Sequence, residues 1–162
     1  MKIIILSFLS ILAFGCVDLT FAEDSLEEHP DRKDVIGVDG EDKEMVAAQK
    51  KALETLMTFI AALQNRDDAK RYLLKVKLEE GEEVEHVWLE PVKWNDPGLL
   101  GILAVDPVAI KKHKKGDIIS PLPRDVSDWV ILSSDGSKVG GFTMDVIEKR
   151  REKEKKSEQN TP

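Results

Sequence analysis

The spacing of apolar residues changes near residue 68, and this change constrains the fold more than any other feature of the sequence. Before it, apolar side chains recur every three or four positions, which places them on one face of an amphipathic helix. Asp39 and Asp42 are candidate N-caps, and Asn65 ends the pattern. The spacing therefore predicts a helix from about residue 42 to residue 63, with a stripe of Met45, Ala48, Ala52, Leu56, Phe59 and Leu63, widened by Leu53 and Ile60.

After residue 68 apolar and polar residues alternate, a pattern typical of half-buried β-strands. Asp135-Gly136 lies between two apolar runs and favours a hairpin turn. Thr143 is the expected N-cap of a last helix, whose apolar side carries Met144 and Ile147. We expect strands at residues 72–78, 84–94, 99–105, 117–119, 129–132 and 138–140.

The order of these elements indicates an α+β fold, because consecutive strands between two terminal helices do not form a parallel βαβ sheet. We expect an N-terminal amphipathic helix, a curved antiparallel sheet of five or six short strands, either open or closed into a small barrel, and a C-terminal helix. This α+β domain spans residues 41–148. An acidic flexible leader precedes it at 23–40, and a charged helical extension with a disordered tail follows at 149–162.

Residues 1–22 have the pattern of an export signal. Lys2 is followed by an apolar run up to Gly15 that is too short to span a bilayer, and Thr20 and Ala22 are small residues before a cleavage point at Glu23. We therefore expect a periplasmic or secreted protein whose mature chain has no membrane span. Lipidation of Cys16, which follows Gly15, is the alternative, and an uncleaved anchor is a third.

The charge is concentrated before the helix, since residues 23–44 carry ten acidic and three basic groups and account for the whole net charge of −7. The remaining mature chain is neutral and has no broad basic surface, which argues against a nucleic-acid partner. The basic run Lys111–Lys115 is interpreted as a solvated loop, with an anion or lipid-headgroup contact as the alternative. Cys16 is the single cysteine, so cleavage after Ala22 removes any thiol.

Several short motifs occur in an order and at spacings that resemble a known family. They are the helix Glu44–Leu63, Val84–Leu89, Lys115–Asp117, Ser127–Trp129 and Val139–Thr143. Together they resemble the YegJ-like proteins, domain-of-unknown-function family 2314, over roughly residues 40–150. The resemblance implies a small bacterial domain without an assigned reaction. Pro91 departs from an ordinary strand and suggests an edge or a bulge at that point.

The tentative binding residues are Glu85, His86, Trp88, Asp128 and Trp129. Their role depends on the register of the first hairpin. If Leu78 faces Val84, His86 and Trp88 join the core. If Glu79 faces Val84, they point outward beside Lys75 and Lys77, because a slip of one residue exchanges the two faces of a strand.

The sequence contains no recognisable catalytic motif, so we expect no catalytic residue, no cofactor and no metal site. A non-catalytic binding or interaction module of the cell envelope is the favoured function, with an envelope protein or a small ligand as its partner. The alternative is a small hydrolase-like or metal-dependent enzyme around His86 and Asp128. Gly140-Gly141 either holds an anion at a helix N-terminus or lets strand and helix pack closely.

Overall fold

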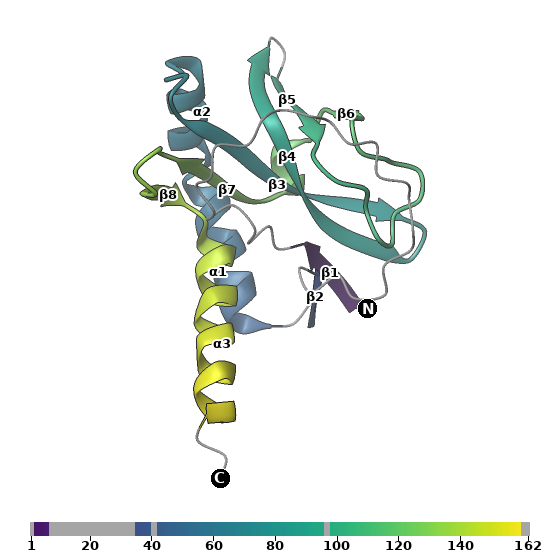
Figure 1. Cartoon of the computed structure of the whole chain (residues 1–162). Helices are drawn as coiled ribbons and strands as arrows, with labels where there is room; N and C mark the ends of the chain where they lie inside the picture. Colours follow the sequence, from purple (N-terminus) through teal and green to yellow (C-terminus); the bar gives the residue numbers. More distant parts are fainter. Residues whose placement is uncertain (1, 7–34, 40–41, 96–97, 160–162) are drawn as a thin grey trace, which may run out of the picture.

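A computed structural model describes residues 2–6, 35–39, 42–95 and 98–159, and it has the expected α+β fold (Figure 1). The three α-helices are α1 (Lys43–Glu54), α2 (Leu56–Gln64) and α3 (Phe142–Gln159). The strands are β1 (Lys2–Leu6), β2 (Val35–Asp39), β3 (Arg71–Glu80), β4 (Glu83–Asn95), β5 (Gly98–Leu103), β6 (Ile118–Ile119), β7 (Val126–Leu132) and β8 (Lys138–Gly140), and a short 3-10 helix, η1 (Pro123–Asp125), precedes β7.

The strands form one sheet in the order β2-β1-β4-β3-β7-β8, and β5 and β6 extend from β4. All of its pairs are antiparallel except β1 with β4. Register shifts lie between Lys75 and Val76 and between Leu89 and Val92, and such bulges bend a sheet. The second shift flanks Pro91 and confirms the irregularity expected there. Within the described residues β6 and β8 pair on one side only, so the sheet curves without closing into a barrel.

Helices α1 and α2 cover one face of the sheet and bury the predicted stripe. Leu53, expected to widen the stripe, is instead 45% exposed. Asp42 is the N-cap of α1, because its Oδ1 accepts the N–H of Met45 at 3.0 Å. The expected single helix is wrong, since α1 ends at Glu54 and α2 begins at Leu56. Thr55 Oγ1 donates to the carbonyl of Lys51, and the indole N–H of Trp129 donates to the carbonyl of Ala52. These side-chain bonds occupy carbonyl oxygens at the end of α1 and accompany the break.

The β3–β4 hairpin has the register in which Glu79 faces Val84, Lys77 faces His86 and Lys75 faces Trp88. The turn consists of Gly81 and Glu82, and Gly81 has φ +61°, a value that favours glycine. The alternative in which Leu78 faces Val84 is therefore wrong.

The expectation that this register exposes His86 and Trp88 is also wrong, because the second face of the sheet is covered as well. A second apolar cluster there contains Leu73, Trp88 and Val130, with Leu132 and Met144 packed against it. Met144 belongs to the first turns of α3. Both faces of the central strands are consequently buried.

The chain ends depart from the expected boundaries. Val35–Asp39, assigned to the flexible leader, forms β2, and Lys2–Leu6, assigned to the signal peptide, forms β1 between β2 and β4. Both segments are rich in β-branched residues, which favour strands. Residues 7–34, with Cys16, Ala22 and most of the leader, lie outside the described residues. At the other end, α3 continues without interruption to Gln159, alongside α1 (Figure 1).

Candidate functional site

Glu85 is fully buried and acts as an anchor for the loop between β5 and β6. Its carboxylate accepts the backbone N–H groups of Val108, Ala109 and Ile110 at 2.9, 2.8 and 3.3 Å. Half-buried Glu80 accepts the next two N–H groups, those of Lys111 and Lys112. Two carboxylates from one hairpin thus hold five consecutive amides. The basic run begins on this anchored loop, and its four lysines are exposed, as expected for a solvated loop.

Asp128 is buried and binds the N-terminus of α3. Its carboxylate accepts the N–H groups of Phe142 and Thr143 at 3.1 and 2.8 Å, and the Thr143 hydroxyl at 2.6 Å. Thr143 is therefore not the N-cap that the sequence suggested; it lies in the first turn, and Asp128 takes the capping role from a distant strand. Burial raises the pKa of Asp128, while the hydrogen bonds from Thr143 and the charge of Lys75 act in the opposite direction.

Gly140 allows the end of β8 to approach β7 closely, directly before α3. It has φ +80°, and a Cβ atom there would lie 2.3 Å from the carbonyl oxygen of Trp129. This contact supports the interpretation that Gly140-Gly141 permits close packing, because a side chain at Gly140 would not fit. At the α3 N-terminus that follows, the chain's own Asp128 carboxylate accepts the first N–H groups.

Lys75 is a buried cation that sequence reasoning missed. Its side chain is 1% exposed, its Nζ lies 3.3 Å from Thr143 Oγ1, and it sits 5.4 Å from the ring centre of Trp88. Burial lowers the pKa of Lys75 to about 8, against the charge of Asp128. The adjacent apolar pair Leu73-Leu74 was the available signal, because neighbouring apolar residues in a strand indicate that both faces are buried.

His86 is also buried, at 4% exposure, and its Nδ1 has no hydrogen-bond partner. Burial lowers the pKa of His86 to about 3, and the charges of Lys75 and Lys77 act in the same direction. The imidazole is therefore neutral at pH 7.

The five residues singled out from the sequence are divided between the two faces of the sheet. His86, Trp88 and Asp128 lie on the second face, where all three surround Lys75. Trp129 packs between Phe59 and Phe142 in the main core, with ring centroids 5.5 and 5.8 Å away. Glu85 lies on that main-core side and binds the loop. All five are buried, and a ligand-binding role for them stays a prediction.

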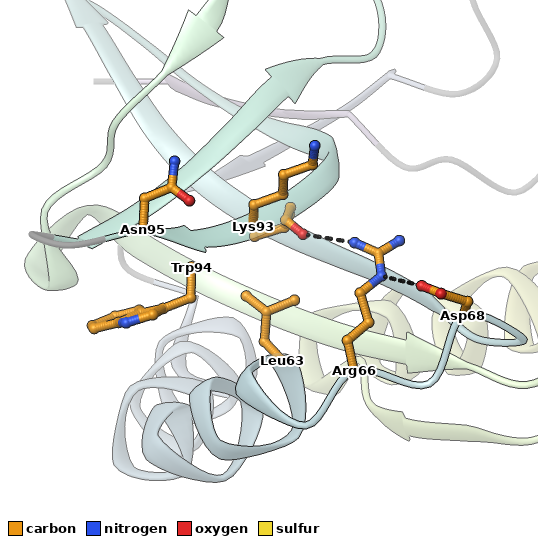
Figure 2. A pocket seen from close by; sticks show the side chains of 7 residues that line it. Leu63, Arg66, Asp68, Lys93, Trp94 and Asn95 are labelled. Atoms are coloured by element: carbon orange, nitrogen blue, oxygen red, sulfur yellow. Dashed lines mark hydrogen bonds and ion pairs between the residues drawn. The ribbon is translucent and has the colours of Figure 1, made fainter.

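An open groove lies elsewhere, between the end of α2 and the second half of β4 (Figure 2). It has a volume of about 480 Å³, within the range of ligand pockets. We call it the Trp94 groove, and it is lined by Leu63, Arg66, Asp68, Val92, Lys93, Trp94 and Asn95. Sequence reasoning missed these residues. The only signal was a tryptophan at the end of a strand, directly before a turn.

Arg66 and Trp94 stand on opposite sides of Leu63 in this groove (Figure 2). Nη1 of Arg66 donates to the carbonyl of Val92 at 3.2 Å, and its Nε lies 3.3 Å from Asp68 Oδ1. The guanidinium also lies 5.4 Å from the ring centre of Tyr72. Three contacts thus orient the guanidinium, while Trp94 across the groove is 39% exposed.

Comparison with known proteins identifies the family. Residues 42–161 match the uncharacterized proteins conserved in bacteria that are designated DUF2314. The chain belongs to the DUF2314 family. Membership of this family confirms the resemblance expected from the sequence, and the narrower YegJ-like name stays a prediction.

One curated relative of this DUF2314 protein comes from Neisseria meningitidis serogroup B and carries the name of an ankyrin repeat protein. The two are 26% identical over 80 residues, which cover 49% of this chain and 31% of the relative. The chain thus spans about a third of the length of that relative. No solved structure matches.

Two further observations concern the described residues alone. They contain no group of three or more His, Cys, Asp or Glu side chains arranged to hold a metal ion. None of the helices among them is long and apolar enough to cross a membrane.

Proposed function

We propose that this chain is a protein-interaction module of the bacterial cell envelope, and that it binds a peptide segment of its partner in the Trp94 groove. The observation that carries the proposal is the groove itself, where exposed Trp94 and oriented Arg66 stand on opposite sides of Leu63 (Figure 2). Tryptophan and arginine are the residue types most enriched among residues that dominate binding energy at protein interfaces. The name of the Neisseria relative is in keeping with a role in protein interaction.

The enzymatic alternative around His86 and Asp128 has less support. A general base must reach its substrate, whereas His86 is buried and both Asp128 oxygens accept hydrogen bonds from the chain itself. The polar groups that could have formed a catalytic set instead hold a loop and a helix in place. A binding surface therefore accounts for the exposed features better than a reaction does.

Selection of displayed random peptides on the purified protein tests this proposal. We expect peptides to be enriched on the wild type and lost on Trp94→Ala, because the indole is the largest apolar side chain that lines the groove. Leu122→Ala is the matched control, since Leu122 is similarly exposed and lies outside the groove. Enrichment that is equal on Trp94→Ala, or no enrichment on any variant, would contradict the proposal. Thermal melts establish that both variants fold.

A further inference from the structure

We propose that the Trp94 groove binds the free C-terminus of a partner chain, whose last residues add to β4 as an antiparallel strand and whose terminal carboxylate binds Arg66. The inference rests on the proposed function and names the partner's chemistry. Three features of the groove carry it: a strand edge without a partner, a cation at one end of that edge, and an apolar floor.

The first feature is the edge of β4 at Lys93–Asn95. β5 pairs with these residues on one side, up to Asn95 with Gly98. On the other side the pairing of β3 with β4 ends at Leu74 with Leu89. Among the described residues, no strand therefore pairs with Lys93–Asn95 on the side away from β5. Extended peptides add to such edges through main-chain hydrogen bonds.

The direction of the backbone groups follows from Val92. Its carbonyl points to Arg66, on the side away from β5. Strand residues direct their N–H and C=O groups alternately to the two sides, so Trp94, two positions further, directs both groups to the same side as Val92. Trp94 consequently offers one donor and one acceptor to an added strand, beside its own exposed ring.

The second feature is Arg66, which closes the edge at the Val92 end. A strand that enters from the Asn95 end must stop at the guanidinium, and it then runs antiparallel to β4. The group that ends a chain there is a carboxylate. Arginine carries five N–H donors in a planar fork that matches a carboxylate. The contacts to Val92 and Asp68 use two of its nitrogen atoms, and they also hold the fork in place before a ligand arrives.

The third feature selects the side chain near the terminus. Buried Leu63 and Val92 form the floor of the groove, and Trp94 forms one wall. Lys93 and Asn95 point away from Leu63, to the opposite side of the strand (Figure 2). A C-terminal segment with an apolar side chain directed at Leu63 fits this arrangement.

Matched pairs of synthetic peptides test the inference. The probes are peptides from a short random library, each made with a free C-terminal carboxylate and as the carboxamide, and binding to the full-length protein is measured by fluorescence anisotropy. We expect amidation to weaken binding at least about tenfold, the effect of losing one charge-assisted hydrogen-bonded contact. Arg66→Gln should weaken binding of the free acid to the level of the carboxamide, so that amidation no longer changes the affinity. Lys70→Gln, which removes a cation of the same loop outside the groove, should leave the difference intact.

Replacement of Asp68, whose carboxylate competes for the Arg66 guanidinium, should change the peptide affinity in the opposite direction. Because Asp68 occupies part of the guanidinium, Asp68→Asn should strengthen binding of the free acid and leave the carboxamide unchanged. Equal binding of acid and carboxamide, or a requirement for an internal acidic residue, would overturn the inference. If peptides that bind without needing a free C-terminus still depend on Trp94, the inference fails but the proposed function survives. If no peptide binds at all, the proposed function fails as well.

Discussion

At the scale of single residues, the interior of this protein is organised around groups that are usually exposed. Lys75, Glu85, His86 and Asp128 are all buried. Glu85 and Asp128 have backbone donors within hydrogen-bond distance, and this compensates for their desolvation. Lys75 has the Thr143 hydroxyl and the Trp88 ring, and Asp128 supplies the opposite charge. Lys75 is therefore the buried charge whose desolvation is least compensated.

Replacement of Lys75 by methionine should raise the free energy of unfolding at pH 7 by about 1–3 kcal/mol, because a similar apolar chain avoids the desolvation of an ammonium group. Asp128 loses its opposite charge in this variant but keeps the donors of Phe142 and Thr143. The pKa of Lys75 is lowered to about 8 in the folded protein, from 10.5. Between these values the unfolded chain binds more protons, so raising the pH stabilises the wild type. The advantage of Lys75→Met should accordingly shrink between pH 8 and 10.5.

Urea titrations of both proteins from pH 7 to pH 10.5 measure this difference. Comparison of the two proteins cancels the other groups that titrate in the same range. A gap that stays constant with pH would contradict the lowered pKa of Lys75. A less stable Lys75→Met variant at pH 7 would show that the contacts with Thr143, Trp88 and Asp128 outweigh the desolvation cost.

At the scale of elements, the junction between β7, β8 and α3 depends on close contacts of a few residues. Asp128 on β7 caps α3, and Gly140 at the end of β8 lies against Trp129 of β7. The N–H of Gly141 donates to the carbonyl of Trp129 at 2.7 Å. This arrangement places the Trp129 indole where it reaches the break between α1 and α2. One glycine thus allows contacts among three elements.

Gly140→Ala should therefore destabilise the protein by about 3 kcal/mol, the sum of left-handed backbone strain and overpacking against Trp129. Gly136→Ala is the matched control: Gly136 has φ +85°, and a Cβ atom there would meet nothing within 4 Å. It should cost only the strain, about 1–2 kcal/mol. Chemical denaturation of both variants measures the difference, and equal losses would show that the close approach to Trp129 contributes nothing.

At the scale of the whole molecule, α1 and α2 cover one face of an open sheet, while α3 reaches the other face through Met144 and lies alongside α1. Arg150 of α3 forms ion pairs with Asp42 and Glu44 at the start of α1, 2.6 and 3.1 Å away. The Arg150 guanidinium, together with the N–H of Met45, holds the pKa of Asp42 down at about 2. The segment after residue 148, expected to be a separate extension, is therefore attached to the domain through α1. The Trp94 groove lies at the other end of this helix pair, beside α2.

The proposed envelope location predicts a defined mature chain. Export with cleavage after Ala22 should remove β1 and give an intact mass that begins at Glu23, because small residues at positions 20 and 22 suit signal peptidase. The mature chain then lacks the strand that pairs with Val84–His86 of β4 in the full chain. Replacement of Ala22 by arginine should block processing and serves as the control. A mass that begins at Cys16 and carries a diacylglycerol group would contradict cleavage at Ala22, and an unprocessed, unexported chain would contradict the envelope location itself.

The sequence by itself was sufficient for the elements that depend on local periodicity and turn chemistry. The stripe from Met45 to Leu63 predicted the helical region, and the alternation after Tyr72 with Asp135-Gly136 predicted the strands and a hairpin. The family followed from short motifs in order. These signals are encoded within a few neighbouring residues, so they can be read without knowing what packs against them.

Only the tertiary structure decided which polar residues are buried and where an open surface lies. Lys75 and His86 look outward-facing by alternation, and they are buried because distant parts of the chain cover the second face of the sheet. Asp128, rather than Thr143, caps α3 because β7 and α3 meet in space. The Trp94 groove arises where the end of α2 approaches an edge of β4 that pairs with no other strand among the described residues. Burial and the grooves left between elements depend on contacts between residues far apart in sequence, and local pattern carries no record of them.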